Sequence, residues 1–246
     1  MTTQLEKGRA FAALHESDET FVTPNPWRGG SACLLEKAGF KALATTSAGF
    51  ATSVGKVEGE IGLEEKLAHC RFLASLTDIP ISADFENGFA DSPAEAAENL
   101  PRAAEAGVVG GSIEDNSGSE IYDFGIAACA QAVATLSFPF TLTARAEGLS
   151  RQSGDLDDIV KRLQAFEAAD ADVLCAPALS NLDEVKIVVD AVSKPINVLA
   201  AFMPAATLSQ YAELGVRRLS VGSSLAIHTT KATVTAAKQM KDGRFD

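Results

Sequence analysis

The sequence has few of the residues that form disulfides, zinc sites or histidine-based catalytic centres. Its 246 residues include four cysteines and three histidines. The cysteines are far apart and form no Cys-x-x-Cys pair, so we expect buried free thiols rather than a disulfide framework. His69 and Cys70 are adjacent in a segment with a helical pattern, where neighbouring side chains diverge and form no zinc site. His15 and His228 are predicted to lie on the surface.

Long apolar runs and an excess of positive charge are also absent. No run of about eighteen apolar residues occurs, so no membrane-spanning helix is expected. The first residues lack the apolar core of a signal peptide, which predicts a cytoplasmic protein. The formal net charge of −12 argues against nucleic acid and anionic membrane surfaces as partners. A small anionic substrate is still compatible, provided that a metal ion or an arginine makes the local field positive.

The sequence does contain a repeating pattern of short apolar strand, polar loop and amphipathic helix, with a period of about thirty residues. No linker or composition break interrupts it, so one domain over residues 1–246 is expected. Eight such units favour a (β/α)8 TIM barrel over an open doubly wound sheet. The predicted strands are Phe21–Thr23, Ala42–Thr45, Ile81–Asp84, Gly111–Ile113, Thr141–Ala144, Val173–Ala176, Ile196–Leu199 and Arg218–Val221.

Two acidic residues follow the third predicted strand. Asp84 and Glu86 are two positions apart at a strand end, so their side chains point the same way. Two partly desolvated carboxylates without a partner are unfavourable there, and a divalent cation removes that cost. Mg²⁺ fits best because it prefers oxygen ligands, whereas zinc would require histidine or thiolate. The alternative is that both are loop acids facing water.

The next two strand ends carry Glu114 and Arg145. Since the carboxyl ends of parallel barrel strands meet at one rim, these side chains are expected to join Asp84 and Glu86 in one site. Glu114 is predicted to reach the metal through water. A buried arginine requires an anion, which for Arg145 is Glu147, Glu114 or a substrate carboxylate. The small residues of 45–49 form either a tight turn or a loop whose backbone amides approach an anionic group.

Several of these segments occur together and in the same order in the isocitrate lyase/phosphoenolpyruvate mutase superfamily, which the chain resembles from about Phe21 to Leu225. The resemblance implies a (β/α)8 barrel that forms a homo-oligomer, a dimer or tetramer, with the last helix exchanged between subunits. It also implies Mg²⁺ and a 2-oxo acid or dicarboxylate substrate, with C–C or P–C chemistry through an enolate-like intermediate. The matching motifs are Pro24-Asn25-Pro26-Trp27, Ala44-Thr45-Thr46-Ser47-Ala48-Gly49, Ala83-Asp84-Phe85-Glu86-Asn87-Gly88, Ser112-Ile113-Glu114-Asp115 and Thr143-Ala144-Arg145-Ala146-Glu147.

The same resemblance implies individual site residues. Asp84 resembles the direct metal ligand. The acids that resemble holders of metal-bound water are Glu58, Glu86 and Glu114. The residues that resemble substrate contacts are Ser47, Ala48, Gly49, Arg145 and Asn197. Arg145 and Glu114 are the implied catalytic residues.

The chain departs from this family in the loop after the fourth strand. The lyase branch carries Lys-Lys-Cys-Gly-His there, and this sequence reads Asn116-Ser117-Gly118-Ser119-Glu120. The leading hypothesis is therefore a Mg²⁺-dependent lyase or decarboxylase of a small, oxaloacetate-like 2-oxo acid, because decarboxylation requires no cysteine acid to start. The alternatives are a phosphonopyruvate-type mutase or hydrolase, and a non-catalytic barrel that binds a metabolite.

Overall fold

All eight predicted strands are present in the computed structural model, and each end lies within one residue of its predicted position. The structure describes residues 2–117, 120–121 and 125–245. The strands pair in parallel in the order β1-β10-β9-β8-β7-β4-β3-β2. Their bounds are β1 Phe21–Thr23, β2 Leu43–Ala44, β3 Ile81–Asp84, β4 Gly110–Glu114, β7 Thr141–Arg145, β8 Val173–Cys175, β9 Ile196–Leu199 and β10 Arg218–Ser220.

The barrel closes between its first two strands through a few contacts at their carboxyl ends. The Ala44 amide donates to the Pro24 carbonyl at 3.2 Å. The Asn25 side chain donates to the Thr45 carbonyl at 3.0 Å and accepts from the Val221 amide at 2.9 Å, so it links the ends of β1, β2 and β10. These contacts complete the (β/α)8 barrel that the sequence predicts.

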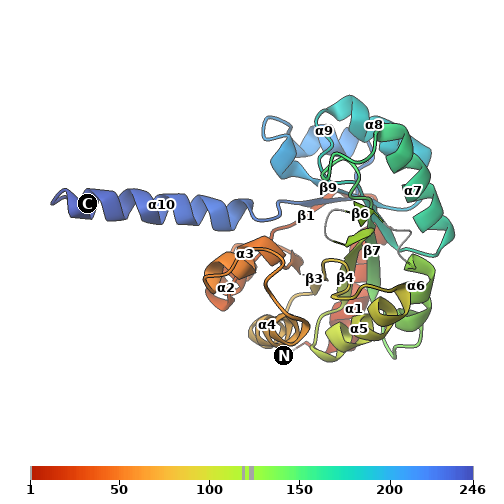
Figure 1. The fold of residues 1–246 in the computed structure, drawn as a ribbon, viewed down its shortest axis with the longest axis horizontal. Coiled ribbons are helices and arrows are strands. Elements are labelled where there is room, and N and C mark those ends of the chain that lie inside the picture. Colours follow the sequence, from red (N-terminus) through yellow and green to blue (C-terminus); the bar gives the residue numbers. More distant parts are fainter. Residues whose placement is uncertain (1, 118–119, 122–124, 246) are drawn as a thin grey trace.

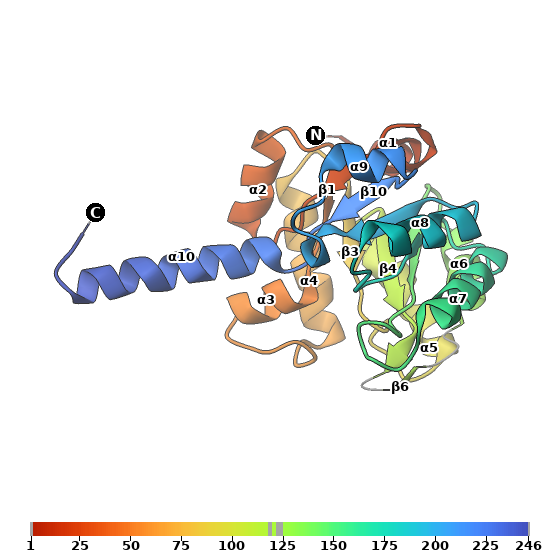
Figure 2. The same cartoon turned by 90° about the horizontal axis from the view of Figure 1, so that it is seen from above.

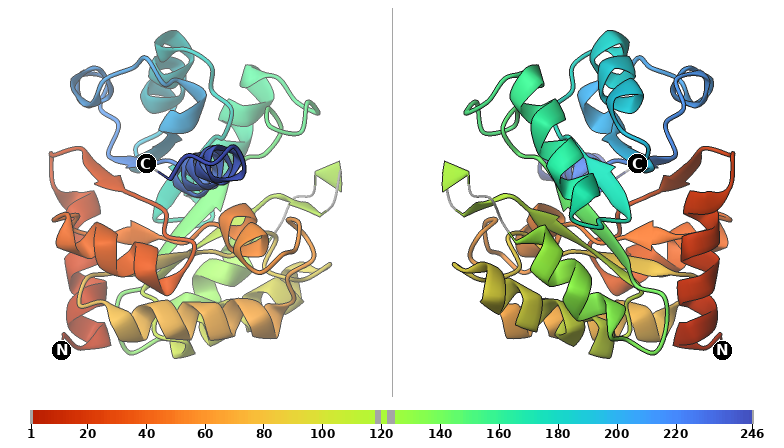
Figure 3. Two further views of the ribbon diagram at one scale, coloured as in Figure 1. Left: turned by 90° about the vertical axis from the view of Figure 1, so that its left-hand side faces the viewer. Right: turned by 90° about the vertical axis from the view of Figure 1, so that its right-hand side faces the viewer.

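Helices surround the sheet, as Figures 1 and 3 show. Their apolar faces pack on it; in α7, for example, Ile159, Leu163 and Phe166 are buried on one face. The bounds are α1 Gln4–Glu16, α2 Gly29–Lys37, α3 Ser47–Ser53, α4 Leu63–Leu76, α5 Pro93–Glu105, α6 Ile126–Ala134, α7 Leu156–Ala168, α8 Leu182–Ala191, α9 Leu208–Glu213 and α10 Ser224–Lys241, with a 3₁₀ turn at Ala200–Phe202. Among the described residues, no helix is long and apolar enough to cross a membrane.

Helix α1 closes the amino-terminal end of the barrel. Phe11 is fully buried, and it lies so close to Gly110, the first residue of β4, that a Cβ there would be 2.9 Å from the Phe11 ring. A Cβ on Gly8 would be 2.5 Å from the Pro139 carbonyl oxygen, just before β7. Both glycines are therefore required by close approach, and α1 forms the floor beneath the strands.

Two features differ from a plain alternation of strands and helices. After β4 the chain forms a two-stranded antiparallel ribbon, β5 (Asn116–Ser117) and β6 (Glu120–Ile121), where the sequence predicted only a loop. At the other end, α10 extends away from the barrel, beyond α2 and α3 (Figures 1 and 2). It keeps Ala226 buried near its start and exposes Ile227, Val234 and Met240.

Candidate active site

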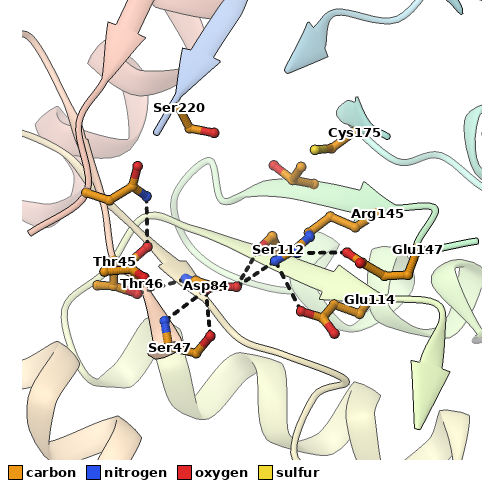
Figure 4. A network of polar contacts seen from close by, with 12 residues as sticks. Thr45, Thr46, Ser47, Asp84, Ser112, Glu114, Arg145, Glu147, Cys175 and Ser220 are labelled. Carbon is orange, nitrogen blue, oxygen red and sulfur yellow. Dashed lines mark hydrogen bonds and ion pairs between the residues drawn. The ribbon is translucent and has the colours of Figure 1, made fainter. Parts of the chain in front are cut away.

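At the carboxyl end of the barrel, Arg145 lies among three carboxylates. Its Nη1 is 2.8 Å from Asp84 Oδ1 and 3.2 Å from Glu114 Oε1, and its Nη2 is 2.7 Å from Glu147 Oε1 (Figure 4). The Arg145 side chain is 16% exposed. Burial alone would lower the pKa of this guanidinium, but Glu114, Glu147 and Asp84 together raise it well above its usual value. The structure thus places three of the four rim residues predicted from strand ends in one network.

Asp84 is held as an ionised carboxylate. Its Oδ2 accepts two hydrogen bonds from Ser47, the first residue of α3. One comes from the backbone amide at 2.9 Å and the other from the hydroxyl at 3.0 Å. Burial raises the pKa of this carboxyl, but Arg145, Lys66 and the bonds from Ser47 outweigh that effect and lower it. Lys66 was not identified from the sequence. It is fully buried on α4, and its Nζ has no hydrogen-bond partner among the described residues.

Glu86 and Glu114 are the acids with the weakest tendency to ionise. Burial raises the pKa of each to about 7, and neighbouring negative charges add to that effect. For Glu86 these are Asp84, Glu114 and Glu58; its Oε1 is buried without a hydrogen-bond partner among the described residues. Its backbone is left-handed, with φ of 49°. Glu58 is exposed but accepts the Ser47 hydroxyl at 2.7 Å, which links it to Asp84.

This donor set fits a magnesium ion. Within the described parts of the chain, no three acidic, histidine or cysteine side chains converge closely enough to ligate one metal together. Mg²⁺ commonly takes one or two carboxylates and keeps several waters, so the absence of such a cluster is compatible with it. The donors are oxygens, and the unpartnered Glu86 oxygen beside like charges is a group that a hydrated cation would satisfy. Asp84 as the direct ligand, and Glu58, Glu86 and Glu114 as acids that hold metal-bound water, stay predictions.

The predicted carboxylate-binding loop makes internal contacts in this structure. The Ser47 amide is used by Asp84, and the Gly49 amide donates to Thr46 Oγ1 at 3.3 Å. Gly49 is required by packing, because a Cβ there would be 2.6 Å from Thr46 Cγ2 and 3.1 Å from Trp27 Cβ. Ala48 lines the central cavity. The role of this loop in substrate binding therefore stays a prediction.

A cavity of about 170 Å³ is lined at the rim by Ser47, Asp84 and Arg145 and extends into the interior of the barrel. TIM-barrel interiors are usually filled by bulky branched residues. Here many of the residues that line the interior have polar side chains, and Figure 4 shows Cys175 and Ser220 across the opening from Asp84. The barrel-strand residues with polar side chains or sulfur that line this cavity below the rim are Ser82, Ser112, Thr143, Cys175, Asn197, Arg218 and Ser220.

Asn197 lies in this wall rather than at the rim. It is buried; its amide nitrogen donates to Cys175 Sγ at 3.3 Å and Ser220 Oγ at 3.1 Å, and its oxygen accepts Arg218 Nε at 2.8 Å. The predicted substrate contact through Asn197 stays a prediction. All four cysteines are free thiols; Cys70, Cys129 and Cys175 are buried as expected, whereas Cys33 is half-buried. Cys175, which lines the cavity, was not identified from the sequence, although its place at the end of a strand is the same kind of signal that located Arg145.

The prediction for His15 is wrong, whereas His228 is exposed as expected. His15 is 7% exposed, and its Nδ1 donates to the Phe11 carbonyl at 2.8 Å. Its Nε2 is 3.2 Å from Arg218 Nη1 and accepts from it. Burial, reinforced by the nearby Arg218 charge, lowers the pKa of the ring to about 3. The imidazole is therefore neutral and belongs to the barrel floor, because α1 folds beneath the strands.

Comparison with known proteins agrees with this arrangement. A solved structure of a candidate lyase/mutase from Burkholderia cenocepacia J2315 is 46% identical, covers 98% of this chain and 91% of that one, and superposes with a TM-score of 0.95. The 2-methylisocitrate lyase of Escherichia coli K12 is 26% identical over 207 residues, which are 77% of this chain and 68% of the relative.

A phosphonopyruvate hydrolase, solved with oxalate and Mg²⁺, shares the fold with a TM-score of 0.86. It is 24% identical, with coverage of 99% of this chain and 89% of that one. The family model for phosphoenolpyruvate phosphomutase matches residues 11–241. The matched residues include all eight barrel strands, the rim network and most of the floor of the barrel. The chain therefore belongs to the phosphoenolpyruvate phosphomutase family, within the superfamily that also includes the isocitrate lyases.

Proposed function

We propose that the protein is a Mg²⁺-dependent lyase that cleaves a C–C bond in a small 2-oxo acid, with decarboxylation of an oxaloacetate-like dicarboxylate as the simplest case. The observation that supports it is the rim network, in which one arginine is held by Asp84, Glu114 and Glu147. These groups can bind a cation and a carboxylate next to each other. The superfamily relationship supports an enzyme of this class, since its members include lyases, mutases and hydrolases.

In this proposal Arg145 changes partners when the site is loaded. With a metal ion bound, Asp84 would be its ligand, so Arg145 Nη1 would be released from Asp84 and would bind the substrate carboxylate, while Nη2 would keep Glu147. The planar guanidinium suits this because it makes two parallel hydrogen bonds to a carboxylate. Glu114 keeps Arg145 in position and, with Glu58 and Glu86, would accept hydrogen bonds from water on a bound ion. A magnesium ion bound here would supply positive charge beside the 2-oxo oxygen, where negative charge develops.

The loop after β4 favours decarboxylation over cleavage of an isocitrate. Positions 116–120 contain neither cysteine nor histidine, so the thiol acid of the lyase branch has no counterpart in this segment. Loss of carbon dioxide from a β-carboxylate requires charge stabilisation at the 2-oxo group but no acid at its start. A cation held by the rim acids would supply that stabilisation, and Arg145 would orient the substrate carboxylate.

The direct test is a substrate panel with purified protein in Mg²⁺ and in EDTA. We expect Mg²⁺-dependent pyruvate formation from oxaloacetate above the spontaneous rate, competitive inhibition by oxalate, and no glyoxylate from isocitrate. Asp84→Asn should abolish the reaction. Faster turnover of phosphonopyruvate than of oxaloacetate would replace the proposal with the P–C alternative. Absence of both turnover and oxalate binding would favour a non-catalytic barrel.

We also propose that the protein forms a homo-oligomer through α10. This helix projects from the barrel (Figure 2), and Ile227, Val234 and Met240 on it are 48%, 47% and 56% exposed. Exposed apolar side chains on a projecting helix are typical of an association surface. Light scattering with size-exclusion chromatography should give a dimer or tetramer, and truncation before Ser224 should give a monomer. A monomeric full-length chain would contradict the proposal.

A further inference from the structure

Arg218 is a buried cation at the floor of the cavity that the proposed reaction does not use. It lies on β10 and is 4% exposed. Its Nε donates to Asn197 Oδ1 at 2.8 Å, its Nη1 to His15 Nε2 at 3.2 Å and its Nη2 to Thr143 Oγ1 at 3.0 Å. The Phe11 ring centroid is 6.0 Å from its Cζ. All of these partners are neutral.

No Asp or Glu among the described residues forms an ion pair with Arg218. A guanidinium taken out of water without a counter-charge is costly, since a buried charge is normally paired. Burial, followed by repulsion from Arg145, lowers its pKa to about 10, so it is still charged at neutral pH. A guanidinium also has five N–H donors. Three are used by the neutral acceptors, and the side chain lines the cavity.

The floor is directly beneath the rim network. Thr143, which accepts from Arg218, precedes Arg145 by two residues on β7, so both side chains point into the barrel. Two residues along a strand correspond to about 7 Å. The cavity walls between these levels are small side chains such as Ser112, Cys175 and Ser220, which leave room for a short ligand. Acids therefore surround the rim, and an unneutralised cation lies one layer below it.

We propose that Arg218 forms a second anion subsite, which binds the distal carboxylate or phosphonate of the substrate while the 2-oxo acid end stays at the rim. The inference rests on the proposed function, because it assumes that the same cavity binds the substrate. Arg218 is the specificity-determining residue, and it selects dianionic over monoanionic substrates. Asn197 and His15 are positioning residues: Asn197 fixes Nε, and the neutral His15 ring accepts from Nη1 without cancelling the charge.

The test compares two stable ligands that differ by one anionic group. L-Malate and 2-hydroxybutyrate differ by a carboxylate in place of a methyl group, and oxalate reports on the rim alone. Calorimetry in Mg²⁺ measures all three with the unmodified protein, Arg218→Met and the control Arg217→Met. Arg217 directly precedes β10, does not line the cavity, and lies 3.8 Å from the exposed Asp18 carboxylate. Thermal unfolding verifies that each variant is folded.

We expect the unmodified protein and Arg217→Met to bind malate at least tenfold more tightly than 2-hydroxybutyrate. Arg218→Met should reduce that ratio to below threefold and change oxalate affinity by less than threefold. Arg218→Lys keeps the charge but lacks the planar set of guanidinium donors. It should give an intermediate ratio of malate to 2-hydroxybutyrate affinity. Oxalate binding with an unchanged ratio in Arg218→Met would overturn this inference and leave the proposed function standing. Absence of oxalate binding to the unmodified protein would overturn the proposed function, and the inference with it.

Discussion

Arg145 and Arg218 both line the cavity of the barrel, but their surroundings differ, and the difference shows how one cavity can separate a site for a cation from a site for an anion. Arg145 at the rim is within ion-pair distance of Asp84, Glu114 and Glu147. Arg218 at the floor contacts only neutral groups. The pKa of the first is raised by its carboxylates, and that of the second is lowered to about 10 by burial. The rim is thus suited to a cation and the floor to an anion.

The largest effect is expected from removing the charge of Asp84 at the rim. Asp84→Asn should abolish the heat of Mg²⁺ binding in calorimetry, because the remaining acids either reach the ion through water or have a pKa of about 7. Asparagine can still accept from Ser47, so the fold should survive. The control Asp190→Asn removes a surface acid that pairs with Lys186 and should bind Mg²⁺ normally. Normal Mg²⁺ binding by Asp84→Asn would show that the rim is not the cation site.

The next largest effect is a difference in stability between variants of the two arginines. Arg145→Met leaves buried carboxylates without their partner and should lower the free energy of unfolding by about 3–5 kcal/mol at pH 8. Arg218→Met loses hydrogen bonds to neutral groups, but it also removes an unpaired charge. Its free energy of unfolding should therefore fall by only about 1–3 kcal/mol. Urea unfolding of both variants measures the difference.

The pH dependence of the Arg145→Met variant sharpens that comparison. Without Arg145, the pKa of Asp84 loses the largest of the effects that lower it, and the pKa of Glu114, already raised to about 7, rises further. The folded state then binds more protons, so this variant should recover stability as the pH falls from 8 to 5.5. Equal losses for both variants, with no recovery at lower pH, would contradict the contrast between rim and floor.

A smaller effect tests the neutral histidine at the floor. The folded-state pKa of His15 is lowered from 6.5 to about 3, so only the unfolded state binds this proton between those values. Stability from this group is complete above pH 6.5 and is lost as the pH falls, by about 2 kcal/mol at pH 5. His15→Gln should therefore lose less stability between pH 7 and 5 than the unmodified protein. His228→Gln changes an exposed position and should keep the pH dependence of stability of the unmodified protein. If His15→Gln also keeps that pH dependence, the His15 ring is exposed to water and the prediction is wrong.

The smallest effect concerns the shape of the rim arginine. Arg145→Lys keeps the charge but cannot make a planar, two-bonded contact with a carboxylate. Oxalate affinity in Mg²⁺ should fall by about tenfold, or ~1.4 kcal/mol. Arg102→Lys, at a surface pair with Glu64, should have no effect. Unchanged affinity in a folded Arg145→Lys protein would confine Arg145 to its internal ion pairs.

The strands and the rim could be predicted because both follow from local patterns. A buried parallel strand is a short apolar run, and eight such runs were readable within one residue of their ends. Polar residues directly after such runs must lie at the carboxyl rim, which explains why Asp84, Glu114 and Arg145 were identified. Glu86 follows β3 by two residues and was also placed near them, although its left-handed backbone was not predicted.

The sequence by itself thus determined the barrel, the family and the residues that face the rim, since these depend on periodicity and on position relative to a strand. Only the tertiary structure decided which charges meet. The contact between His15 and Arg218 joins residues 203 positions apart, and Ser47 reaches Asp84 across 37 positions. A pattern along the chain predicts the secondary structure and the position of a residue. The neighbours that set its charge and pKa come from strands and helices that are distant in sequence. For that reason the acidic rim was predicted and the cationic floor was not.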